Sequence, residues 1–242
     1  MNLYREQGVV LRTWKLGEAD RIVVLMTQGQ GKVRAVAKGV RKTRSRFGGR
    51  LEPFSHVDLS LYRGRELDIV TQAEVVAPFR TLREDYDRVV AGTAMLEAVD
   101  QVAQEREAAV RIYLLLVRAL RALDGAPRDP SVVLDAFLLK LMALEGYRPA
   151  LAECAGCGRR VPLRSFSIAR GGGLCDRCRT GEESVLDRAT VPLLAALLGD
   201  DLDATAAAAP APASRREAGA LVKGYVEYHL ERRLRAYPLV AR

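Results

Sequence analysis

The sequence has few of the residues that enzymes commonly use for catalysis. Only two of its 242 residues are histidines, His56 and His229, and no acid–base or nucleophile motif surrounds either one. The G-x-x-x-x-G-K-[ST] pattern of phosphate-binding loops is missing. The K-x-D-G motif of enzymes that join DNA ends is also missing, since its nearest match is ALDG at residues 122–125. We therefore expect a binding protein that is not an enzyme.

Long apolar segments are missing as well. No apolar run reaches the roughly 18 residues that a membrane-spanning helix requires. The N-terminal residues lack the basic-then-apolar layout of a signal peptide, and no lipidation motif is present. We therefore expect a cytoplasmic location. In that reducing compartment, the four cysteines of the chain are more suited to binding a metal than to forming disulfides.

The positive charge of the chain is concentrated in one segment. Lys and Arg total 38 against 30 Asp and Glu, which gives a net charge of +8. Residues 32–50, KVRAVAKGVRKTRSRFGGR, contain eight basic residues and no acidic one. The rest of the chain therefore has 30 basic and 30 acidic residues, and no net charge. Such a local stripe suits a phosphate backbone. The candidate phosphate contacts are Lys32, Arg34, Lys38, Arg41, Lys42, Arg44, Arg46 and Arg50.

The same segment is predicted to consist of a strand and a loop. Lys32, Arg34 and Lys38 share parity on a predicted strand, so their side chains are expected on one face of it. The rest of the basic residues follow in a glycine-containing loop, where Phe47 either stacks on a base or packs beneath the loop. No base-reading helix accompanies the segment, so binding without sequence specificity is expected.

The first 79 residues show the pattern of a small β-barrel. Valine-rich stretches at 7–13, 21–27 and 32–38 are separated by turn signals, and an antiparallel hairpin is predicted from residue 56 onward. Five short strands with one apolar side predict an OB-fold, although the number of strands alone also fits an SH3-like barrel.

After residue 79 the periodicity becomes helical. Thr81 and Glu84 have the spacing of a capping box before a first helix. A second helix is predicted near 107–123. A third is predicted to begin at Asp129, where a proline follows the cap, and to stop at Gly146. Their apolar stripes indicate the core of a helical bundle.

Helical patterning returns after the cysteines. The segment 190–198 is apolar enough for a buried helix, and the Ala/Pro-rich segment 204–214 is predicted to be a flexible connection. The last helix is predicted to begin at Ser214, with Glu217 in the capping-box position, and to run to about Arg235. The fold class is therefore α+β. The predicted units are an OB-fold domain at 1–79, a helical domain at 80–149 and 184–242, and a cysteine module at 150–183 inserted into it.

The four cysteines form the most specific local motif. CAGC and CDRC are two Cys-x-x-Cys knuckles separated by 17 residues, a spacing that lets Cys154, Cys157, Cys175 and Cys178 surround one tetrahedral ion. We predict bound Zn²⁺, with redox-active dithiols or disulfides as the alternatives. Because four thiolates leave no position for water or substrate, such a zinc ion is structural. The arginines between the knuckles either face solvent or touch a ligand.

Two other functions are compatible with these features. Asp58, Glu66, Asp68 and Glu74 lie on one predicted hairpin, so a metal-dependent nuclease is one alternative. An RNA-binding OB-fold protein is the other. Preference for structured RNA over single-stranded DNA would identify the second, and metal-dependent cleavage that requires Asp58 or Asp68 would identify the first.

Several stretches resemble the RecO family of bacterial recombination-repair proteins. These are GVVLRTWKLGEADRIVVLMT, GKVRAVAKGVRKTRSRFGGRLEPF, the paired Cys-x-x-Cys knuckles and HLERRLR, which lie in order along essentially the whole chain. The resemblance implies an OB-fold, a helical domain and an inserted zinc-binding module. It also implies a recombination mediator that binds single- and double-stranded DNA and anneals complementary strands.

The resemblance also implies partners. RecO-like proteins work with RecR to load RecA onto single-stranded DNA that is coated by single-stranded-DNA-binding protein (SSB). The helical domain is expected to bind the acidic C-terminal tail of SSB. The expected location is the cytoplasm, in association with the nucleoid during repair.

Overall fold

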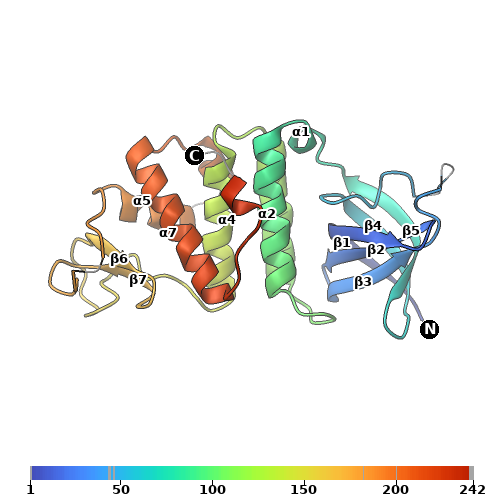
Figure 1. Cartoon of the computed structure of the whole chain (residues 1–242), viewed down its shortest axis with the longest axis horizontal. Coiled ribbons are helices and arrows are strands. Elements are labelled where there is room, and N and C mark those ends of the chain that lie inside the picture. Colours follow the sequence, from blue (N-terminus) through green and yellow to red (C-terminus); the bar gives the residue numbers. More distant parts are fainter. Residues whose placement is uncertain (1, 43–44, 46, 182, 200, 240–242) are drawn as a thin grey trace.

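The N-terminal part of the chain is a closed five-stranded barrel (Figure 1). The computed structural model describes residues 2–42, 45, 47–181, 183–199 and 201–239. The barrel strands are β1 (Leu3–Leu16), β2 (Asp20–Thr27), β3 (Gly31–Ala37), β4 (His56–Tyr62) and β5 (Asp68–Ala77). Their order around the barrel is β1-β2-β3-β5-β4, with β3 and β5 parallel and the other pairs antiparallel. This is the arrangement of an OB-like barrel, as the sequence predicted.

Alternating side chains divide the barrel into an inner and an outer face. On β2, Val23 and Leu25 point into the barrel core, whereas Val24 and Met26 belong to a second core that is shared with the helices. The inner core is completed by residues from every strand and by Phe47 and Leu51 from the β3–β4 connection. The outer face of β1 and β2 therefore serves as the docking surface for the rest of the chain.

The remainder of the chain is mainly helical and packs around one central helix. The helices are α1 (Arg80–Arg83), α2 (Tyr86–Val102), α3 (Val110–Asp124), α4 (Pro130–Leu144), α5 (Thr190–Gly199), α6 (Leu202–Ala207), α7 (Pro212–Leu230) and the 3₁₀ turn η1 (Tyr237–Leu239). Helix α4 is buried along most of its length and contacts α2, α3, α5, α6 and α7. Helix α4 starts where the sequence predicted. The Asp129 side chain accepts a hydrogen bond from the Ser131 N–H as the N-cap, and Pro130 occupies the first helical position.

A small cysteine-containing module interrupts the helices between α4 and α5. It contains the two-stranded sheet of β6 (Ser165–Ser167) and β7 (Gly172–Leu174). The barrel and this module lie at opposite ends of the molecule, with the helices between them (Figure 1). In the part of the chain that the structure describes, none of the helices has the length and apolar character needed to cross a bilayer.

The predicted starts of two helices were wrong. Thr81 lies within the single turn α1, and α2 is capped instead by Asp85, whose backbone is extended and whose side chain accepts the Arg88 N–H. Helix α7 begins at Pro212, so Ser214 and Glu217 are already inside it. Proline at the first helical position has a backbone angle that suits the helix, and this signal outweighed the capping-box pattern.

Ser214 and Glu217 fasten α7 to the segment before α5. The Ser214 hydroxyl donates to Asp187 Oδ1 at 3.0 Å, and Glu217 Oε2 accepts from the Asp187 N–H at 2.9 Å and the Thr190 hydroxyl at 2.6 Å. Helix α7 ends at Leu230 rather than near Arg235, because Glu231 adopts a left-handed backbone with φ 52°.

The Ala-rich segment predicted to be a flexible connection begins inside helix α6 (Leu202–Ala207) and ends inside α7. Asp201 caps α6 by accepting the Ala204 N–H, and Leu202 and Thr205 are buried against the bundle. Alanine has the highest helix propensity, so a cap and two buried anchors suffice to order the turn.

Candidate nucleic-acid interface and metal centre

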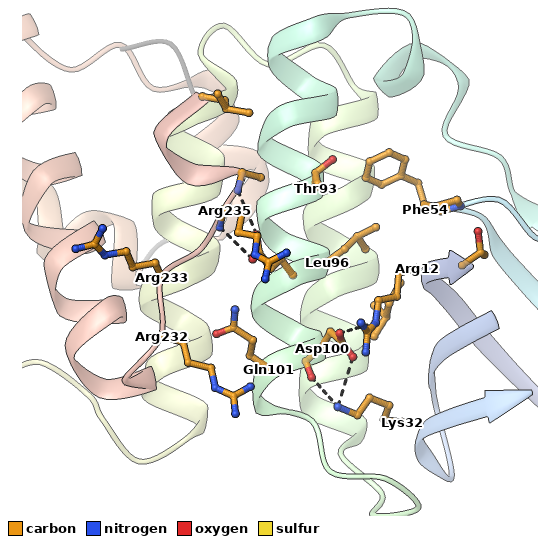
Figure 2. A pocket seen from close by; sticks show the side chains of 16 residues that line it. Arg12, Lys32, Phe54, Thr93, Leu96, Asp100, Gln101, Arg232, Arg233 and Arg235 are labelled. Atoms are coloured by element: carbon orange, nitrogen blue, oxygen red, sulfur yellow. Dashed lines mark hydrogen bonds and ion pairs between the residues drawn. The ribbon is translucent and has the colours of Figure 1, made fainter. Parts of the chain in front are cut away.

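The strand half of the basic segment is docked against the helical part of the chain. Lys32 Nζ donates to the Asp100 carbonyl at 2.6 Å and lies 3.4 Å from Asp100 Oδ1. Arg12 Nε lies 2.8 Å from the other carboxylate oxygen of Asp100, so two cations from the barrel converge on one carboxylate of α2 (Figure 2). Arg34 Nη1 is 3.6 Å from Glu105 Oε1. Lys32 and Arg34 do project from the same strand face, and both have acidic partners there.

A backbone contact accompanies these ion pairs. The loop between α2 and α3 runs along β3, where the Lys32 N–H donates to Gln104 O at 3.2 Å and the Arg106 N–H donates to Lys32 O at 3.0 Å. Gly31 makes this approach feasible, because a Cβ at that position would lie 1.7 Å from the Glu107 carbonyl oxygen. The loop therefore acts as a short additional strand beside β3, and only glycine fits at its closest point.

Part of the barrel face that binds ligands in many OB-folds is covered by helices. That face is formed by the outer side of strands 2 and 3. Val24 and Met26 on β2, with Val9 and Leu11 on β1, belong to the same hydrophobic core as α2 and α3. The surface that remains accessible to a ligand is therefore the uncovered part of this face and the loops at the ends of the barrel.

The loop half of the basic segment lies at the end of the barrel that is remote from this docking contact. Lys38, Arg41, Lys42 and Arg50 are exposed. Arg41 Nη1 donates to the carbonyls of Gly17 and Glu18, at 3.2 and 2.8 Å, and so ties the loop to the β1–β2 turn. The remaining predicted contacts, Arg44 and Arg46, lie outside the described residues.

Phe47 packs beneath this loop rather than standing in solvent. Its side chain is 1% exposed and belongs to the barrel core with Leu51. Of the two roles considered for Phe47, packing is therefore the one that the structure supports. The burial of Phe47 anchors the end of the loop to the barrel, while Lys38, Arg41 and Lys42 before it are exposed.

The acidic residues considered for a nuclease site do not share a site. Asp58 and Glu74 face each other on the exposed side of the β4–β5 hairpin. Asp68 is fully buried and accepts hydrogen bonds from the Tyr4 hydroxyl at 2.5 Å, the Gly64 N–H at 2.9 Å and Arg106 Nη2 at 3.0 Å. Burial acts to raise the pKa of Asp68, but these donors outweigh it and lower the pKa, so the carboxylate is ionised and structural.

His56 belongs to the contact between the barrel and α3. Its Nε2 lies 2.8 Å from the Tyr113 hydroxyl, and the side chain is buried. Burial lowers the pKa of His56, and the charge of Arg121 lowers it further. The neutral ring therefore forms part of the barrel–helix interface, in agreement with the structural role expected from its isolated position in the sequence.

A large cleft separates the barrel from the C-terminal segment. It has a volume of about 1150 Å³ and lies between α2, the outer face of β1 and the residues that follow α7 (Figure 2). Arg12, Arg232, Arg233 and Arg235 line it. No signal in the sequence marks Arg12 as part of a site, because its position opposite the C-terminal arginines depends on how the helices dock on the barrel.

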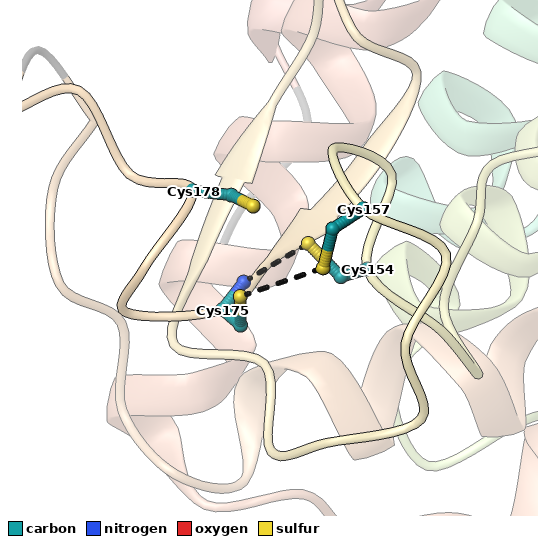
Figure 3. Close-up of side chains that lie close together, drawn as sticks. All are labelled: Cys154, Cys157, Cys175 and Cys178. Atoms are coloured by element: carbon teal, nitrogen blue, oxygen red, sulfur yellow. Dashed lines mark hydrogen bonds between the residues drawn. The ribbon is translucent and has the colours of Figure 1, made fainter.

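The four cysteines converge as the spacing predicted (Figure 3). Their sulfur atoms all lie within 4.8 Å of one another, and the Cys157 and Cys175 sulfurs are 4.0 Å apart. Four sulfurs at tetrahedral corners, each roughly 2.3 Å from a zinc ion, would be separated by about 3.8 Å. The cluster is therefore able to hold a metal ion with four thiolate ligands.

Backbone donors support a thiolate at Cys154. The N–H groups of Gly156 and Cys175 each lie 3.4 Å from the Cys154 sulfur. Burial acts to raise the pKa of this thiol, but the backbone donors outweigh it and lower the pKa to about 6. Hydrogen bonds that the Cys178 thiol donates to the other sulfurs raise its pKa to about 12. A bound dication would remove the competition among the four sulfurs for protons.

Arg170 connects the two knuckles. Its Nη1 donates to the Cys178 carbonyl at 3.2 Å and lies next to Gly156, where a Cβ would come 3.2 Å from that nitrogen and 2.9 Å from Cys178 Cβ. The glycine in the first knuckle thus leaves room for the second knuckle and for Arg170. This contact orients the ligand loops around the site.

Comparison with known proteins identifies the family. The models described as "Recombination protein O N terminal" and "Recombination protein O C terminal" match residues 1–79 and 83–238. The chain belongs to the RecO family. A DNA repair protein RecO of Frankia casuarinae is 48% identical over 244 residues that cover 100% of both chains. A DNA repair protein RecO of Thermobifida fusca is likewise 48% identical with full coverage of both chains.

A third RecO relative extends this agreement. The DNA repair protein RecO of a Nocardioides species is 50% identical over 246 residues, which cover 99% of this chain and 100% of the relative. The RecO assignment agrees with the OB-like barrel, the helical part and the cluster of four cysteines described above.

Proposed function

We propose that the chain is a recombination mediator that binds single- and double-stranded DNA without sequence specificity and anneals complementary strands. The observation that carries this proposal is the exposed group of Lys38, Arg41, Lys42 and Arg50 in a segment without acidic residues. Such a group attracts phosphates and reads no bases. Arg44 and Arg46 complete the cationic set by sequence.

The two halves of the basic segment make different contributions in this proposal. The loop residues contact phosphates directly. Arg34 keeps 39% of its side chain exposed and contributes at the margin, whereas Lys32, at 15%, mainly holds the barrel against α2. Neutralising the phosphates of two strands lowers the repulsion between them, which is how the loop would promote annealing.

The partners belong to the same proposal. Together with RecR, the protein helps to load RecA onto SSB-coated strands, and its helical part binds the acidic tail of SSB. It acts in the cytoplasm, at the nucleoid during repair, and it catalyses no covalent step. The membership in the RecO family supports these roles, because the relatives are DNA repair proteins.

The first test is the salt dependence of binding to a labelled single-stranded oligonucleotide. The variant Lys38→Glu/Lys42→Glu should bind more weakly, and the slope of log K against log salt should become shallower by about 1.4 if both lysines contact phosphates. The matched control is Arg111→Glu/Arg118→Glu, which makes the same change in net charge on the exposed face of α3.

The comparison of the two variants separates a local site from a general charge effect. Near-normal binding by the α3 variant, with a large loss in the loop variant, supports the proposed site. Equal losses would show that net charge alone governs binding, and unchanged binding by the loop variant would remove the loop from the site. A preference for structured RNA over single-stranded DNA in competition would overturn the DNA assignment.

We further propose that Cys154, Cys157, Cys175 and Cys178 bind a structural Zn²⁺ ion. Zinc supplies the cross-link that residues 150–183, with only a three-residue pair of strands, cannot provide through a core of their own. One zinc ion per chain is expected by elemental analysis. Cys157→Ser should lower the zinc affinity while the barrel remains folded. Full zinc retention by that variant would contradict the assignment.

A further inference from the structure

The uncovered part of the outer barrel face carries an aromatic residue among cations. The strand register places Arg12, Val24 and Arg34 in one row across β1, β2 and β3. The next row, closer to the basic loop, consists of Trp14, Ile22 and Val36. Residues paired across neighbouring strands point to the same face. Trp14 therefore lies next to a small apolar surface on the same side as the two arginines.

Trp14 is the only tryptophan in the chain, and it is half-buried. The guanidinium of Arg12 lies over the indole at 5.0 Å from the ring centroid. Because Arg12 is also paired with Asp100, that contact holds the indole beside the docked helix α2. The ring packs in part against the core shared with the helices, and its remaining surface borders an open cavity.

The cavity beside Trp14 adjoins the large cleft and is lined by Arg12, Lys32 and Arg34 together with the carboxylates that pair with them, Asp100 and Glu105. It has a volume of about 550 Å³ and shares Arg12, Thr13, Lys32 and Asp100 with the lining of that cleft. Beyond the shared residues, the cleft presents Arg232, Arg233 and Arg235. Across the described ranges of the chain, none of these three guanidinium groups has an acidic partner within ion-pair distance.

Cations also continue on the other side of Trp14. The exposed Lys38 comes directly after the end of β3 at Ala37, two residues beyond Val36 of the Trp14 row, so it lies where this face meets the basic loop. Trp14 thus lies between the loop cations and the arginines of the cleft. A flexible polyanion that follows this path would pass over the indole.

We propose that Trp14 stacks on a base of single-stranded DNA that crosses this face from the basic loop toward the cleft. This inference rests on the proposed DNA-binding function and names its strand class and one of its contacts. A single strand is favoured over a duplex because its bases have free faces, and stacking on aromatic side chains is largely independent of sequence. An acidic peptide would use the cations but would gain little from the indole.

The sole tryptophan provides a direct test with the unmodified protein. Binding of a thymidine oligonucleotide should quench the Trp14 fluorescence. An abasic oligonucleotide of the same length carries the same phosphates and should bind with little quenching. A duplex should also bind with little quenching, because its bases are already stacked. A label on each DNA reports binding independently of the tryptophan.

Three variants measure the contribution of the contact. Trp14→Ala should weaken binding of the thymidine oligonucleotide by roughly five- to tenfold, which corresponds to one base stack at the weak end of the usual range. Trp14→Phe should retain most of the affinity. Tyr62→Ala removes another aromatic ring, 45% exposed, from the opposite end of the barrel and should leave binding unchanged.

The outcomes separate this inference from the proposed function. If the labelled thymidine oligonucleotide binds but the tryptophan signal does not change, or if the abasic strand quenches equally, Trp14 does not stack on a base while DNA binding stands. Equal weakening of thymidine and abasic strands by Trp14→Ala would likewise overturn the stacking role. If no labelled DNA binds to the wild-type protein, the proposed function itself fails.

Discussion

The two halves of the basic segment have similar composition and different structural roles. In β3, Lys32 and Arg34 face α2 and the loop after it, and both have acidic partners. In the β3–β4 loop, Lys38 and Lys42 face solvent at the other end of the strand. One half joins two parts of the molecule, and the other half is available to a polyanion.

The difference shows that a run of cations in a sequence combines two populations. The acidic residues that pair with the strand half, Asp100 and Glu105, lie about 70 residues further along the chain, so no local pattern reveals them. Removing one partner of a largely buried pair such as Lys32–Asp100 destabilises the native state, because a charge is left unpaired, whereas exposed cations contribute little to stability. The two halves are therefore expected to respond oppositely to substitution.

Disrupting the contact between β3 and the α2–α3 loop by a substitution at Gly31 should have the largest effect on stability. Gly31→Ala would place a Cβ 1.7 Å from the Glu107 carbonyl and would also strain a backbone with φ 65°. We expect a loss of about 2–4 kcal/mol in the free energy of unfolding, measured in urea. Amide exchange of Lys32 and Arg106 should accelerate, because the bonds from their N–H groups to Gln104 O and Lys32 O open.

Gly17→Ala is the matched control for that variant. Gly17 has a similar backbone, with φ 59°, but a Cβ there would have no neighbour within 4 Å. Only the backbone strain remains, so a loss of about 1 kcal/mol is expected. If both variants lose the same stability, the close contact between β3 and the α2–α3 loop contributes nothing.

The paired and exposed lysines offer the sharpest test of the comparison. Lys32→Met keeps the apolar stem and removes the charge that contacts Asp100, so it should cost about 1–2 kcal/mol in stability with little change in the salt slope of DNA binding. Lys38→Met should change stability by less than about 0.5 kcal/mol and should make that slope shallower by about 0.7. The reverse pattern would show that the two roles are exchanged.

The pH dependence of stability should report the same interface with a smaller effect. Burial and the charge of Arg121 lower the pKa of His56 below its unfolded value of about 6.5. Above that pH the ring is neutral in both states. As the pH falls below it, the unfolded chain binds a proton first, so stability decreases until the folded pKa is passed.

The histidine variants separate the two contributions. We expect wild-type stability to decrease by on the order of 1 kcal/mol between pH 7 and pH 5. His56→Gln should show a smaller decrease. The remainder belongs to His229, whose pKa is also lowered by burial. An unchanged pH profile in the His56 variant would mean that its neutral form does not stabilise the interface.

Much of the fold followed from local patterns. Period-two alternation predicted the β4–β5 hairpin, and the cap at Asp129 predicted the start of α4, because each depends on residues that are close in sequence. The starts of α2 and α7 were wrong because two capping signals competed within a few residues. Helix α6 was missed because its burial depends on tertiary contacts that an Ala-rich sequence does not reveal.

The site was predictable to a more limited extent. The cysteine cluster was predicted because ligand spacing encodes its geometry. The covering of the barrel face by helices was not, since Val24 and Met26 look the same in sequence whether they face a core or a ligand. The relation of Trp14 and Arg12 to the cleft depends on that docking. It became visible only once the strand register and the position of α2 were known.

The contact between β3 and the α2–α3 loop has a consequence for any attempt to isolate the barrel. β3 pairs with β5 at only two positions, and the loop satisfies backbone groups of Lys32 that would otherwise form a free edge. A fragment ending near residue 79 would expose this edge together with Val9, Leu11, Val24 and Met26. Unprotected strand edges next to apolar patches self-associate. Such a fragment is expected to form oligomers in size-exclusion chromatography, with its native partner replaced by another copy of itself.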